Sequence, residues 1–257
     1  MTAPVFLTDP GTLDGYQVDD LFVLGGAEGR HAGVVQRRSA GERIDVADGA
    51  GLRLIGEIES VGPEGVQLRV RERVQEERSA PRLVLVQALA KGDRDEMAIE
   101  AATEVGVDVV IPWQAERSIV IWRGDRAAKS RARWLATVRA AAKQSRRSWV
   151  PEVEHAADRR ALVERTRQVV AAGGAVLVLH EEAHAPLSGP EIAVPVDGTD
   201  AEVLIVVGPE GGISEQETAA LVEAGAQTVR LGPHVLRTST AGTVALTLLA
   251  ARLGRWH

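Results

Sequence analysis

One string of residues has the spacing of a complete catalytic motif. His180-Glu-Glu-Ala-His184 matches H-E-x-x-H, in which two histidines on one helix face hold zinc and the glutamate acts as general base. The apolar run Leu177-Val-Leu179 leads directly into this string, and Pro186 disfavours helix in the residues just before it. We therefore expect a strand that ends in a loop, and a zinc hydrolase on His180 and His184 is kept as an alternative.

A second candidate site is the glycine-rich segment Val207-Gly-Pro-Glu-Gly-Gly-Ile-Ser214, between an apolar run and a helix-capping pattern. In an open parallel sheet, ligands bind where strands end. Gly211 and Gly212 permit positive φ and a close approach of the backbone to a ligand, and the following helix offers free N–H groups. A tight turn between a strand and a helix explains the same residues equally well.

A second loop repeats this arrangement. Leu231-Gly-Pro-His-Val-Leu-Arg-Thr-Ser-Thr-Ala241 leaves another short strand and opens the last helix with consecutive hydroxyl residues. Ser239 or Thr240 can equally be a simple N-cap, and Arg237 a solvated charge. With the strand end at Leu179-His180, three strand ends meet at one predicted site. Phosphate-binding, dinucleotide-binding and nucleophile-elbow glycine motifs are absent from the sequence.

The surrounding residues alternate between strand and helix patterns from residue 83 onwards. Continuous apolar runs of this kind are typical of parallel strands covered on both faces. Strands are predicted at 83–89, at 107–111 with Pro112 as the stop, and at 175–179, 202–207 and 228–231.

Helices are predicted from capping patterns and apolar periodicity. Capping boxes open helices at Asp93-Arg-Asp-Glu96 and at Ser214-Glu-Gln-Glu217, the second ending near Gly225. The residues expected to face inward are Leu135, Val138 and Ala142 in a helix over 127–145, and Ala241, Val244, Ala245, Leu248 and Leu249 in the last helix.

The first 73 residues differ in pattern. Residues 43–47, 52–58 and 66–71 alternate with period two, and turn residues separate them, which predicts a small β-rich domain. Residues 74–82 are charged and poor in apolar side chains, so we place a linker there and a second domain at 83–257.

Composition narrows the class of protein. The 257 residues are 45% hydrophobic and 26% charged, as in soluble globular proteins, and the length suits one large or two modest domains. Zero cysteines exclude disulfides, thiolate nucleophiles and cysteine-held metals. The first residues lack a signal-peptide pattern, and no apolar run approaches the ~20 residues that span a bilayer, so we expect a cytoplasmic protein.

Charge is distributed unevenly along the chain. The net charge is −6, but residues 122–149 hold nine cations against Asp125 alone, a local charge of +8 that leaves −14 elsewhere. A solvated helix face explains most charge runs. A segment this basic favours RNA phosphates as partner, because local patches rather than net charge decide binding.

Several motifs together resemble the RsmE family, the 16S ribosomal RNA uridine-N3 methyltransferases of the SPOUT superfamily. The two loops carry the resemblance, as Gly208-Pro-Glu-Gly-Gly-Ile-Ser214 with Glu217 and as Leu231-Gly-Pro-His-Val-Leu-Arg237 with Thr240-Ala241. Further similarity to the catalytic domain of the family lies in Lys91-Gly-Asp93, 100–107, Ile111-Pro112, Arg117-Ser118, Gln144-Ser-Arg146 and Pro151. Similarity to its PUA-like domain lies in His31, Val34, Val35, Arg37 and Gly41.

The resemblance implies an α/β fold: a SPOUT-type parallel sheet with a carboxyl-terminal trefoil knot, preceded by a PUA-like RNA-binding domain over residues 1–73. It also implies a homodimer through the knot region, and methylation of N3 of one uridine of 16S rRNA, position 1498, in the 30S subunit. The implied cofactor is S-adenosylmethionine, and no metal is implied.

One departure stands out, because Ser239 occupies a position where the family usually has glutamate. An inactive RNA-binding protein is therefore a further alternative.

Site residues follow from the loops and the resemblance together. Arg237 is the candidate to stabilise the developing uridinate or hold a phosphate, and Glu210 is the candidate for an acid/base or orienting role, or merely fixes its loop. The expected cofactor contacts are Leu179, His180, Val207, Gly208, Pro209, Glu210, Gly211, Gly212, Leu231, Gly232, Val235, Leu236, Arg237, Thr238 and Ala241. The expected RNA contacts are His31, Arg37, Arg38, Arg43, Arg123, Arg126, Lys129, Arg139, Lys143, Arg146 and Arg147.

Overall fold

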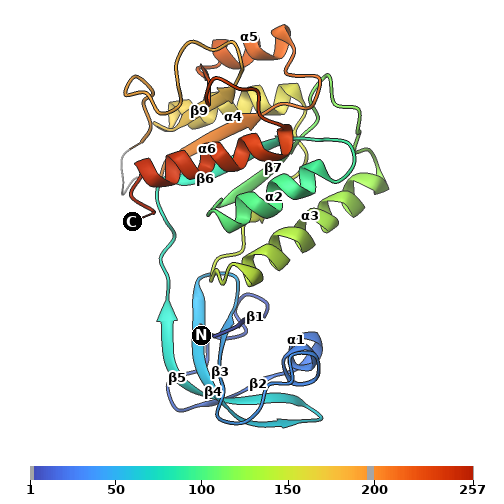
Figure 1. The fold of residues 1–257 in the computed structure, drawn as a ribbon, viewed down its shortest axis with the longest axis vertical. Coiled ribbons are helices and arrows are strands. Elements are labelled where there is room, and N and C mark those ends of the chain that lie inside the picture. Colours follow the sequence, from blue (N-terminus) through green and yellow to red (C-terminus); the bar gives the residue numbers. More distant parts are fainter. Residues whose placement is uncertain (1–2, 196–199, 257) are drawn as a thin grey trace. The chain divides into compact units, whose positions relative to one another are not determined.

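The computed structural model describes residues 3–195 and 200–256, and these form two compact units (Figure 1). The first unit comprises residues 1–78 together with 142–150, and the second comprises 79–141 with 151–257. The first unit is therefore discontinuous in sequence. A single linker at 74–82, as predicted, would separate two continuous domains and does not account for residues 142–150.

A five-stranded sheet forms the first unit, in the order β1-β3-β4-β5-β2. The pairing of β1 with β3 is parallel and the others are antiparallel. Alternate side chains of these strands fill one apolar core, as the period-two patterns predict. The elements of this unit are β1 (Val5–Leu7), β2 (Leu21–Leu24), α1 (Gly26–Arg30), the π-helix η1 (His31–Val35), β3 (Arg43–Ala47), β4 (Leu52–Gly62) and β5 (Gly65–Gln75).

Residues 142–150 join the first unit through specific polar contacts. The Arg53 side chain donates to Ser148 Oγ at 2.8 Å, and the Trp149 indole N–H donates to the carbonyl of Glu76 at 3.1 Å. Gly51 lies against the Trp149 ring with φ +97°, and a Cβ there would lie 2.5 Å from a ring carbon. A glycine is required at this point by both the backbone conformation and the close approach.

The second unit is built on a six-stranded sheet in the order β11-β9-β10-β6-β7-β8. Every pairing in it is parallel, which confirms the expectation from the continuous apolar runs. The elements of this unit are β6 (Arg82–Ala88), α2 (Arg94–Glu104), β7 (Val109–Trp113), α3 (Asp125–Gln144, whose last turn belongs to the first unit), β8 (Glu152–Val153), α4 (Arg159–Ala171), β9 (Ala175–Leu179), β10 (Glu202–Val207), α5 (Glu215–Glu223), β11 (Gln227–Val229) and α6 (Thr238–Arg252).

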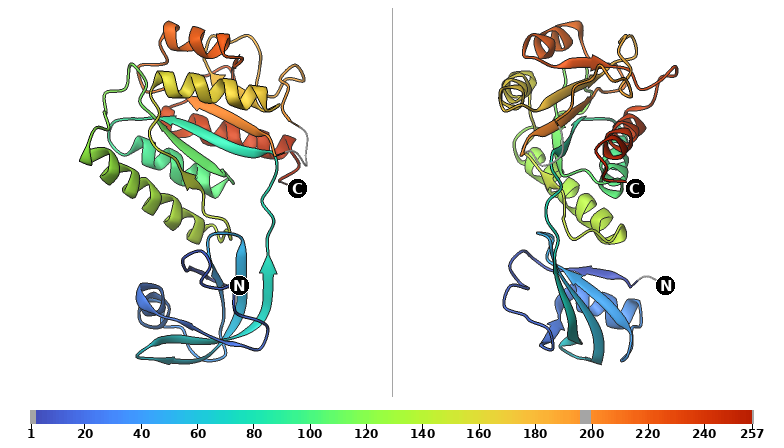
Figure 2. Two further views of the ribbon diagram at one scale, coloured as in Figure 1. Left: turned by 180° about the vertical axis from the view of Figure 1, so that it is seen from behind. Right: turned by 90° about the vertical axis from the view of Figure 1, so that its left-hand side faces the viewer.

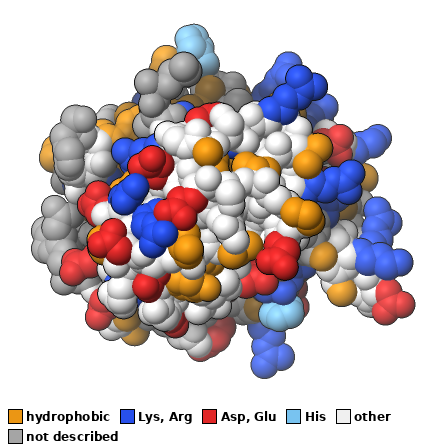
Figure 3. All heavy atoms as spheres, turned by 90° about the horizontal axis from the view of Figure 1, so that it is seen from below, with side chains coloured by type: hydrophobic (Ala, Val, Ile, Leu, Met, Phe, Trp, Pro, Cys, Tyr) orange, Lys and Arg blue, Asp and Glu red, His pale blue; other side chains and the backbone are white. Residues whose placement is uncertain are grey.

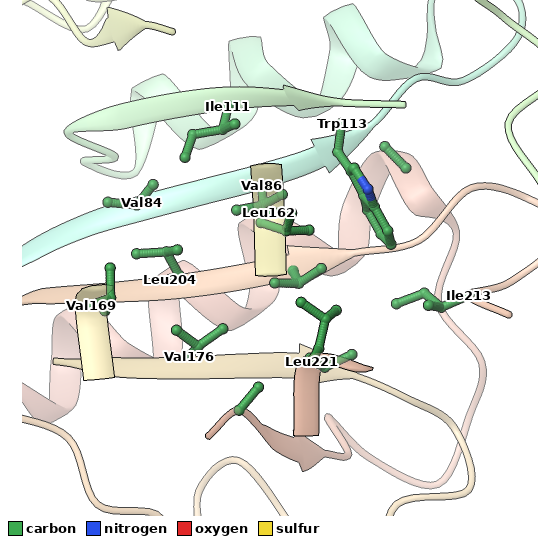
Figure 4. Packing of buried hydrophobic residues seen from close by; sticks show 14 of the residues in the cluster. Val84, Val86, Ile111, Trp113, Leu162, Val169, Val176, Leu204, Ile213 and Leu221 are labelled. Atoms are coloured by element: carbon green, nitrogen blue, oxygen red, sulfur yellow. The ribbon is translucent and has the colours of Figure 1, made fainter. Parts of the chain in front are cut away.

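Helices cover both faces of this sheet (Figure 2). On one face α4 and α5 pack on a cluster that includes Val84, Val86, Leu162 and Leu221 (Figure 4). On the other face α2 and α6 pack together, and α6 lies over β6 and β10. Gly242 permits this approach, since a Cβ there would lie 2.8 Å from the Leu85 side chain. None of the described helices is long and apolar enough to cross a bilayer.

At two element ends the prediction fails for a reason that the structure shows. β7 runs through Pro112 to Trp113 instead of stopping at the proline. The Pro112 carbonyl accepts a hydrogen bond from Ala157 on the side where β8 has already ended, so the missing N–H interrupts no ladder. At the start of α2, Asp93 has φ +59° and its side chain makes no capping hydrogen bond, so the predicted capping box is not formed.

The buried faces of two helices also differ from the prediction. In α3, Leu135 is exposed, and Trp134 takes the inward position with Val138 and Ala142. The Trp134 ring packs edge-on against Trp122 at 5.1 Å, and this large contact sets the rotation of the helix. In α6, the predicted inward residues Val244 and Leu248 are 38% and 36% exposed, whereas Ala241, Ala245 and Leu249 are buried as predicted.

Candidate functional site

A cavity of about 560 Å³ opens where β9, β10 and β11 end. The chain segments that follow these three strands form its walls, and the first turn of α6 closes one side. This is the edge of a parallel sheet at which ligands bind, because the loops that leave successive strands converge there. The cavity therefore lies at the site predicted from the three strand ends.

The structure brings together all of the predicted cofactor contacts except one. Only Gly211 does not line the cavity, and its carbonyl instead accepts a hydrogen bond from Arg117 at 3.0 Å. Six further residues line the cavity that sequence reasoning did not include: Arg94, Glu181, Ile213, Arg230, Pro233 and His234.

The loop after β10 is held by a turn and a capping box. Gly212 has φ +73° and donates its N–H to the carbonyl of Pro209 at 2.9 Å, which closes the turn. Ser214 then caps α5 as predicted, since its Oγ accepts from the Glu217 N–H and the Glu217 carboxylate accepts from the Ser214 N–H, both at 3.2 Å. The loop is thus fixed at both ends, which suits a wall that must keep its shape.

Glu210 projects from this loop toward the start of α2. Its Oε1 accepts hydrogen bonds from the Arg94 side chain at 2.7 Å and from the Lys91 N–H at 3.3 Å. Partial burial tends to raise the pKa of Glu210, but hydrogen bonds from its own N–H, from Arg94 and from Lys91 outweigh this and leave the pKa below its usual value. Glu210 is therefore an ionised carboxylate at neutral pH.

The loop after β11 presents unused backbone groups. Within the described chain, the N–H groups of Gly232, His234, Val235 and Leu236 donate to no backbone carbonyl. The loop ends at Arg237, the exposed N-cap of α6, whose guanidinium pairs with no described carboxylate. The site thus combines free backbone donors with Arg237, a cation that pairs with no described carboxylate.

The first turn of α6 is anchored from two directions. The Thr238 hydroxyl donates to the carbonyl of Gly208 at 2.7 Å and accepts from the side-chain amide of Gln87 at 2.9 Å. Gln87 belongs to β6 and is fully buried. These two bonds link β6, the end of β10 and the start of α6.

The H-E-x-x-H string does not form the geometry of a zinc site. β9 ends at Leu179, and residues 180–184 follow as a turn and bend, so the prediction of a strand and loop is confirmed. The Nδ1 atom of His180 accepts the Glu182 N–H at 3.2 Å. Because the two histidines do not lie on consecutive turns of a helix, they do not present a shared metal-binding face.

In the first unit, three of the cations predicted to bind RNA form ion pairs with nearby carboxylates. Arg38, Arg43 and Lys143 each pair with a carboxylate of the same unit, at 2.8, 3.2 and 2.7 Å. His31 lies beside the Phe6 ring, with ring centroids 6.1 Å apart. The remaining members of the set in this unit are exposed Arg37 and Arg146, both with positive φ, and half-buried Arg147.

In the second unit, Arg123, Arg126 and Lys129 are exposed at the amino-terminal end of α3. Arg139, further along, is half-buried. Arg131 and Arg133 of the same helix are held in place, by the carbonyl of Val153 and by Glu96 respectively. Figure 3 shows lysine and arginine side chains gathered along the edge at which this end of α3 lies in Figure 1.

Comparisons with known proteins place this site in a family. Residues 77–250 match the family model described as RNA methyltransferase domain. The chain is also 46% identical over 234 residues to ribosomal RNA small subunit methyltransferase E of Mycobacterium bovis, an alignment that covers 91% of this chain and 87% of the relative. The chain belongs to the ribosomal RNA small subunit methyltransferase E family. The Bacillus subtilis member is 33% identical, with 89% of each chain covered.

A solved structure of the family extends the similarity to both units. The Neisseria gonorrhoeae ribosomal RNA small subunit methyltransferase E, crystallised with S-adenosylmethionine, superposes with a TM-score of 0.81 at 27% identity, covering 98% of each chain. The expected fold, a SPOUT-type parallel sheet after a PUA-like β-rich unit, is thereby confirmed.

Two residues that contact the site were missed because their sequence signals are weak. Arg94 lies inside what reads as a capping pattern, and its place in the cavity wall and its contact with Glu210 depend on the fold. Gln87 is a single polar residue in an otherwise apolar strand, and that interruption is a signal the sequence does contain.

Proposed function

We propose that the protein transfers a methyl group from S-adenosylmethionine to N3 of a uridine in the 16S rRNA of the small ribosomal subunit, at the position that the RsmE family methylates. The observation that carries this proposal is the cavity at the ends of β9, β10 and β11, lined by the loop residues characteristic of the family. Its test is the direct detection of the methylated nucleoside.

The residues present fit the cofactor. The volume of the cavity, about 560 Å³, lies in the ordinary range of small-molecule sites, roughly 300–1,000 Å³. Leu179, Val207, Leu231 and Leu236 supply an apolar wall for a planar base. The free N–H groups of Gly232, His234, Val235 and Leu236 supply the polar contacts that read its edge. Recognition through backbone groups accounts for the lack of a phosphate-binding or dinucleotide motif.

When bound, the cofactor supplies an electrophilic methyl group on a sulfonium centre. Attack by uridine N3 is an in-line displacement, so holding the base at the correct distance and angle provides much of the rate. N3 first gives its proton to solvent, which leaves negative charge on the uracil ring. Formation of the N3–methyl bond then breaks the sulfur–methyl bond and yields a neutral thioether. Arg237 is placed at the cavity without a carboxylate partner among the described residues, which leaves its guanidinium free to stabilise that charge or an adjacent phosphate.

Glu210 has an orienting role in this proposal. A carboxylate whose pKa is lowered by Arg94 is a poor proton acceptor, since general bases work best with a pKa near the operating pH. Its bonds to Arg94 and Lys91 instead hold the loop after β10 against the start of α2.

The cations Arg123, Arg126 and Lys129 are proposed to contact rRNA phosphates, together with the remaining predicted cations of each unit. Such contacts position the RNA without reading its sequence. The target base must be single-stranded or turned out of its helix, because N3 lies on the pairing edge of uracil. Residues 1–78 with 142–150 serve as the RNA-binding unit in this proposal, and the second unit as the catalytic one.

A homodimer through α6 and the adjoining segment, which the family resemblance predicts to be knotted, forms part of the same proposal, as does a cytoplasmic location. Thr240, Val244, Leu248 and Ala251 form an exposed stripe along α6, mostly apolar, and its burial in a dimer accounts for these side chains.

The decisive experiment incubates the purified protein with methyl-labelled S-adenosylmethionine and undermethylated 30S subunits, followed by nucleoside analysis of the 16S rRNA. Labelled 3-methyluridine supports the proposal. Binding of the subunit without label in the RNA would support an inactive RNA-binding protein, to which Ser239 gives some weight. Stoichiometric zinc in the active protein, with loss of activity on chelation, would revive a metal enzyme on His180 and His184.

A further inference from the structure

Gln87 is a fully buried polar residue close to the carboxyl end of β6. Its neighbours in the strand are apolar, and its pairing partners in β10 and β7 are Val207 and Pro112. Its side-chain N–H₂ group donates to the carbonyl of Ala88 at 3.2 Å and to Thr238 Oγ1 at 2.9 Å. This side chain therefore reaches from the centre of the sheet to the first turn of α6.

The direction of the hydrogen bonds fixes what residue can stand at this position. The Thr238 hydroxyl carries one hydrogen, and that hydrogen is donated to the carbonyl of Gly208. The same oxygen can then only accept, so the group opposite it must be a donor. The amide of Gln87 meets this requirement, whereas a carboxylate or a methyl group does not.

Gln87 is an unfavourable choice for stability alone. Its Oε1 is buried and has no hydrogen-bond partner among the described residues. A buried acceptor left unpaired is destabilising, and an apolar side chain of similar size would avoid the loss. Such a residue is expected where geometry at a functional site outweighs local stability.

We propose that Gln87 is a positioning residue for the cofactor cavity, acting through Thr238. The two bonds hold the start of α6 at a fixed distance from the end of β10, and these segments form two walls of the cavity. Arg237 directly precedes Thr238, so the same anchor fixes the backbone from which its side chain extends. The reference to the cofactor rests on the proposed function, whereas the anchoring of residues 231–241 does not.

The test compares hydrogen exchange of residues 231–241 in the cofactor-free full-length protein with the affinity for S-adenosylmethionine by calorimetry. Gln87→Leu is expected to keep or raise the melting temperature and to weaken cofactor binding roughly tenfold, the loss of about one hydrogen bond. Within 231–241 it should speed exchange by about tenfold or more at the Thr240 and Ala241 amides, which donate to the carbonyl of Arg237. Gln87→Met, which removes the donor without adding a titratable group, should act in the same direction.

Threonine variants separate positioning from general destabilisation. Thr238→Val should reproduce the faster exchange, whereas Thr238→Ser, which keeps the hydroxyl, should keep the exchange rates of the wild type. Thr166→Val is the matched control, because that hydroxyl is equally buried and bonds the carbonyl of Leu162 in α4, away from the cavity. It should lower the melting temperature without changing exchange in 231–241.

Unchanged exchange in both Gln87→Leu and Thr238→Val would overturn the inference. So would a loss of cofactor affinity in all variants in proportion to their loss of melting temperature. A wild-type protein that does not bind S-adenosylmethionine would refute the proposed function, and the exchange measurement would still decide whether Gln87 anchors the loop.

Discussion

The guanidinium of Arg94 lies 2.7 Å from Oε1 of Glu210, and this ion pair joins the first residue of α2 to the loop after β10. The Lys91 N–H donates to the same oxygen. Two segments separated by more than a hundred residues are thereby held together beside the cavity. The charge of Glu210 therefore serves to hold its loop in place.

Glu210→Gln should lower the free energy of unfolding at pH 7 by at most about 1 kcal/mol, because the pair is partly exposed. The folded-state pKa of Glu210 is lowered, so its contribution is present above the unfolded-state value and is lost as pH falls below it. The difference between wild type and variant should therefore be constant near neutral pH, decrease as the pH falls below 4.5, and disappear below the folded-state pKa, measured by urea unfolding.

Methyl transfer by the same variant should fall by no more than about tenfold, with the main change in KM for the cofactor. If Glu210 were the proton acceptor, turnover of Glu210→Gln would be abolished instead.

Ser214→Ala should destabilise the protein by about 1–2 kcal/mol, because the change removes the N-cap of α5. It also removes a hydrogen bond from Ser214 Oγ to Glu116 at 2.7 Å. Asp158→Ala removes the cap of α4, where Asp158 accepts from the Ala161 N–H at 2.8 Å, and serves as control. Both should shift the denaturation midpoint, but only Ser214→Ala should weaken cofactor binding.

Local patterns predicted most of this fold. The strands at 43–47, 175–179 and 202–207 lie where their apolar runs indicate, and the capping box at Ser214 forms as read. These features depend on neighbours in sequence, so a single sequence contains the information. The three strand-end loops followed, because parallel strands bring their carboxyl ends to one edge.

What the sequence could not predict depends on contacts between distant residues. Trp134 instead of Leu135 faces inward, because the Trp134 ring packs against the ring of Trp122. Residues 142–150 join the first unit through Arg53 and Trp149, a partnership without a local signal. Similarly, Arg94 gains its role only from Glu210, over a hundred residues away.

Arg237→Ala should lower the rate of methyl transfer by about 10²–10³-fold, the usual effect of removing one donor that stabilises developing charge. Cofactor affinity should change by only a few-fold. Arg237→Lys should recover part of the rate, since it keeps the charge but loses the forked geometry of the guanidinium. Single-turnover rates on 30S subunits measure the effect, and an unchanged rate in Arg237→Ala would remove this residue from the mechanism.

Leu248→Glu should convert the proposed dimer into a monomer, because it places a charge in the exposed stripe of α6. Val222→Glu is a suitable control, since Val222 is 46% exposed on α5 and outside that stripe. Sedimentation velocity of both variants distinguishes the outcomes. A wild-type protein that sediments as a monomer at micromolar concentration would contradict the proposed interface.

Replacing Arg126 and Lys129 together by glutamine should weaken 30S binding and reduce its dependence on salt. Each cation that contacts a phosphate releases about one counterion, so the slope of log affinity against log salt should fall by about 1.5–2. Arg159→Gln with Arg160→Gln makes the same charge change at exposed positions of α4 and should leave the slope unchanged. Cofactor affinity should be unaffected in both, because neither pair lines the cavity. Equal slopes for the two double variants would mean that α3 contributes only general charge, and the RNA surface would have to lie elsewhere.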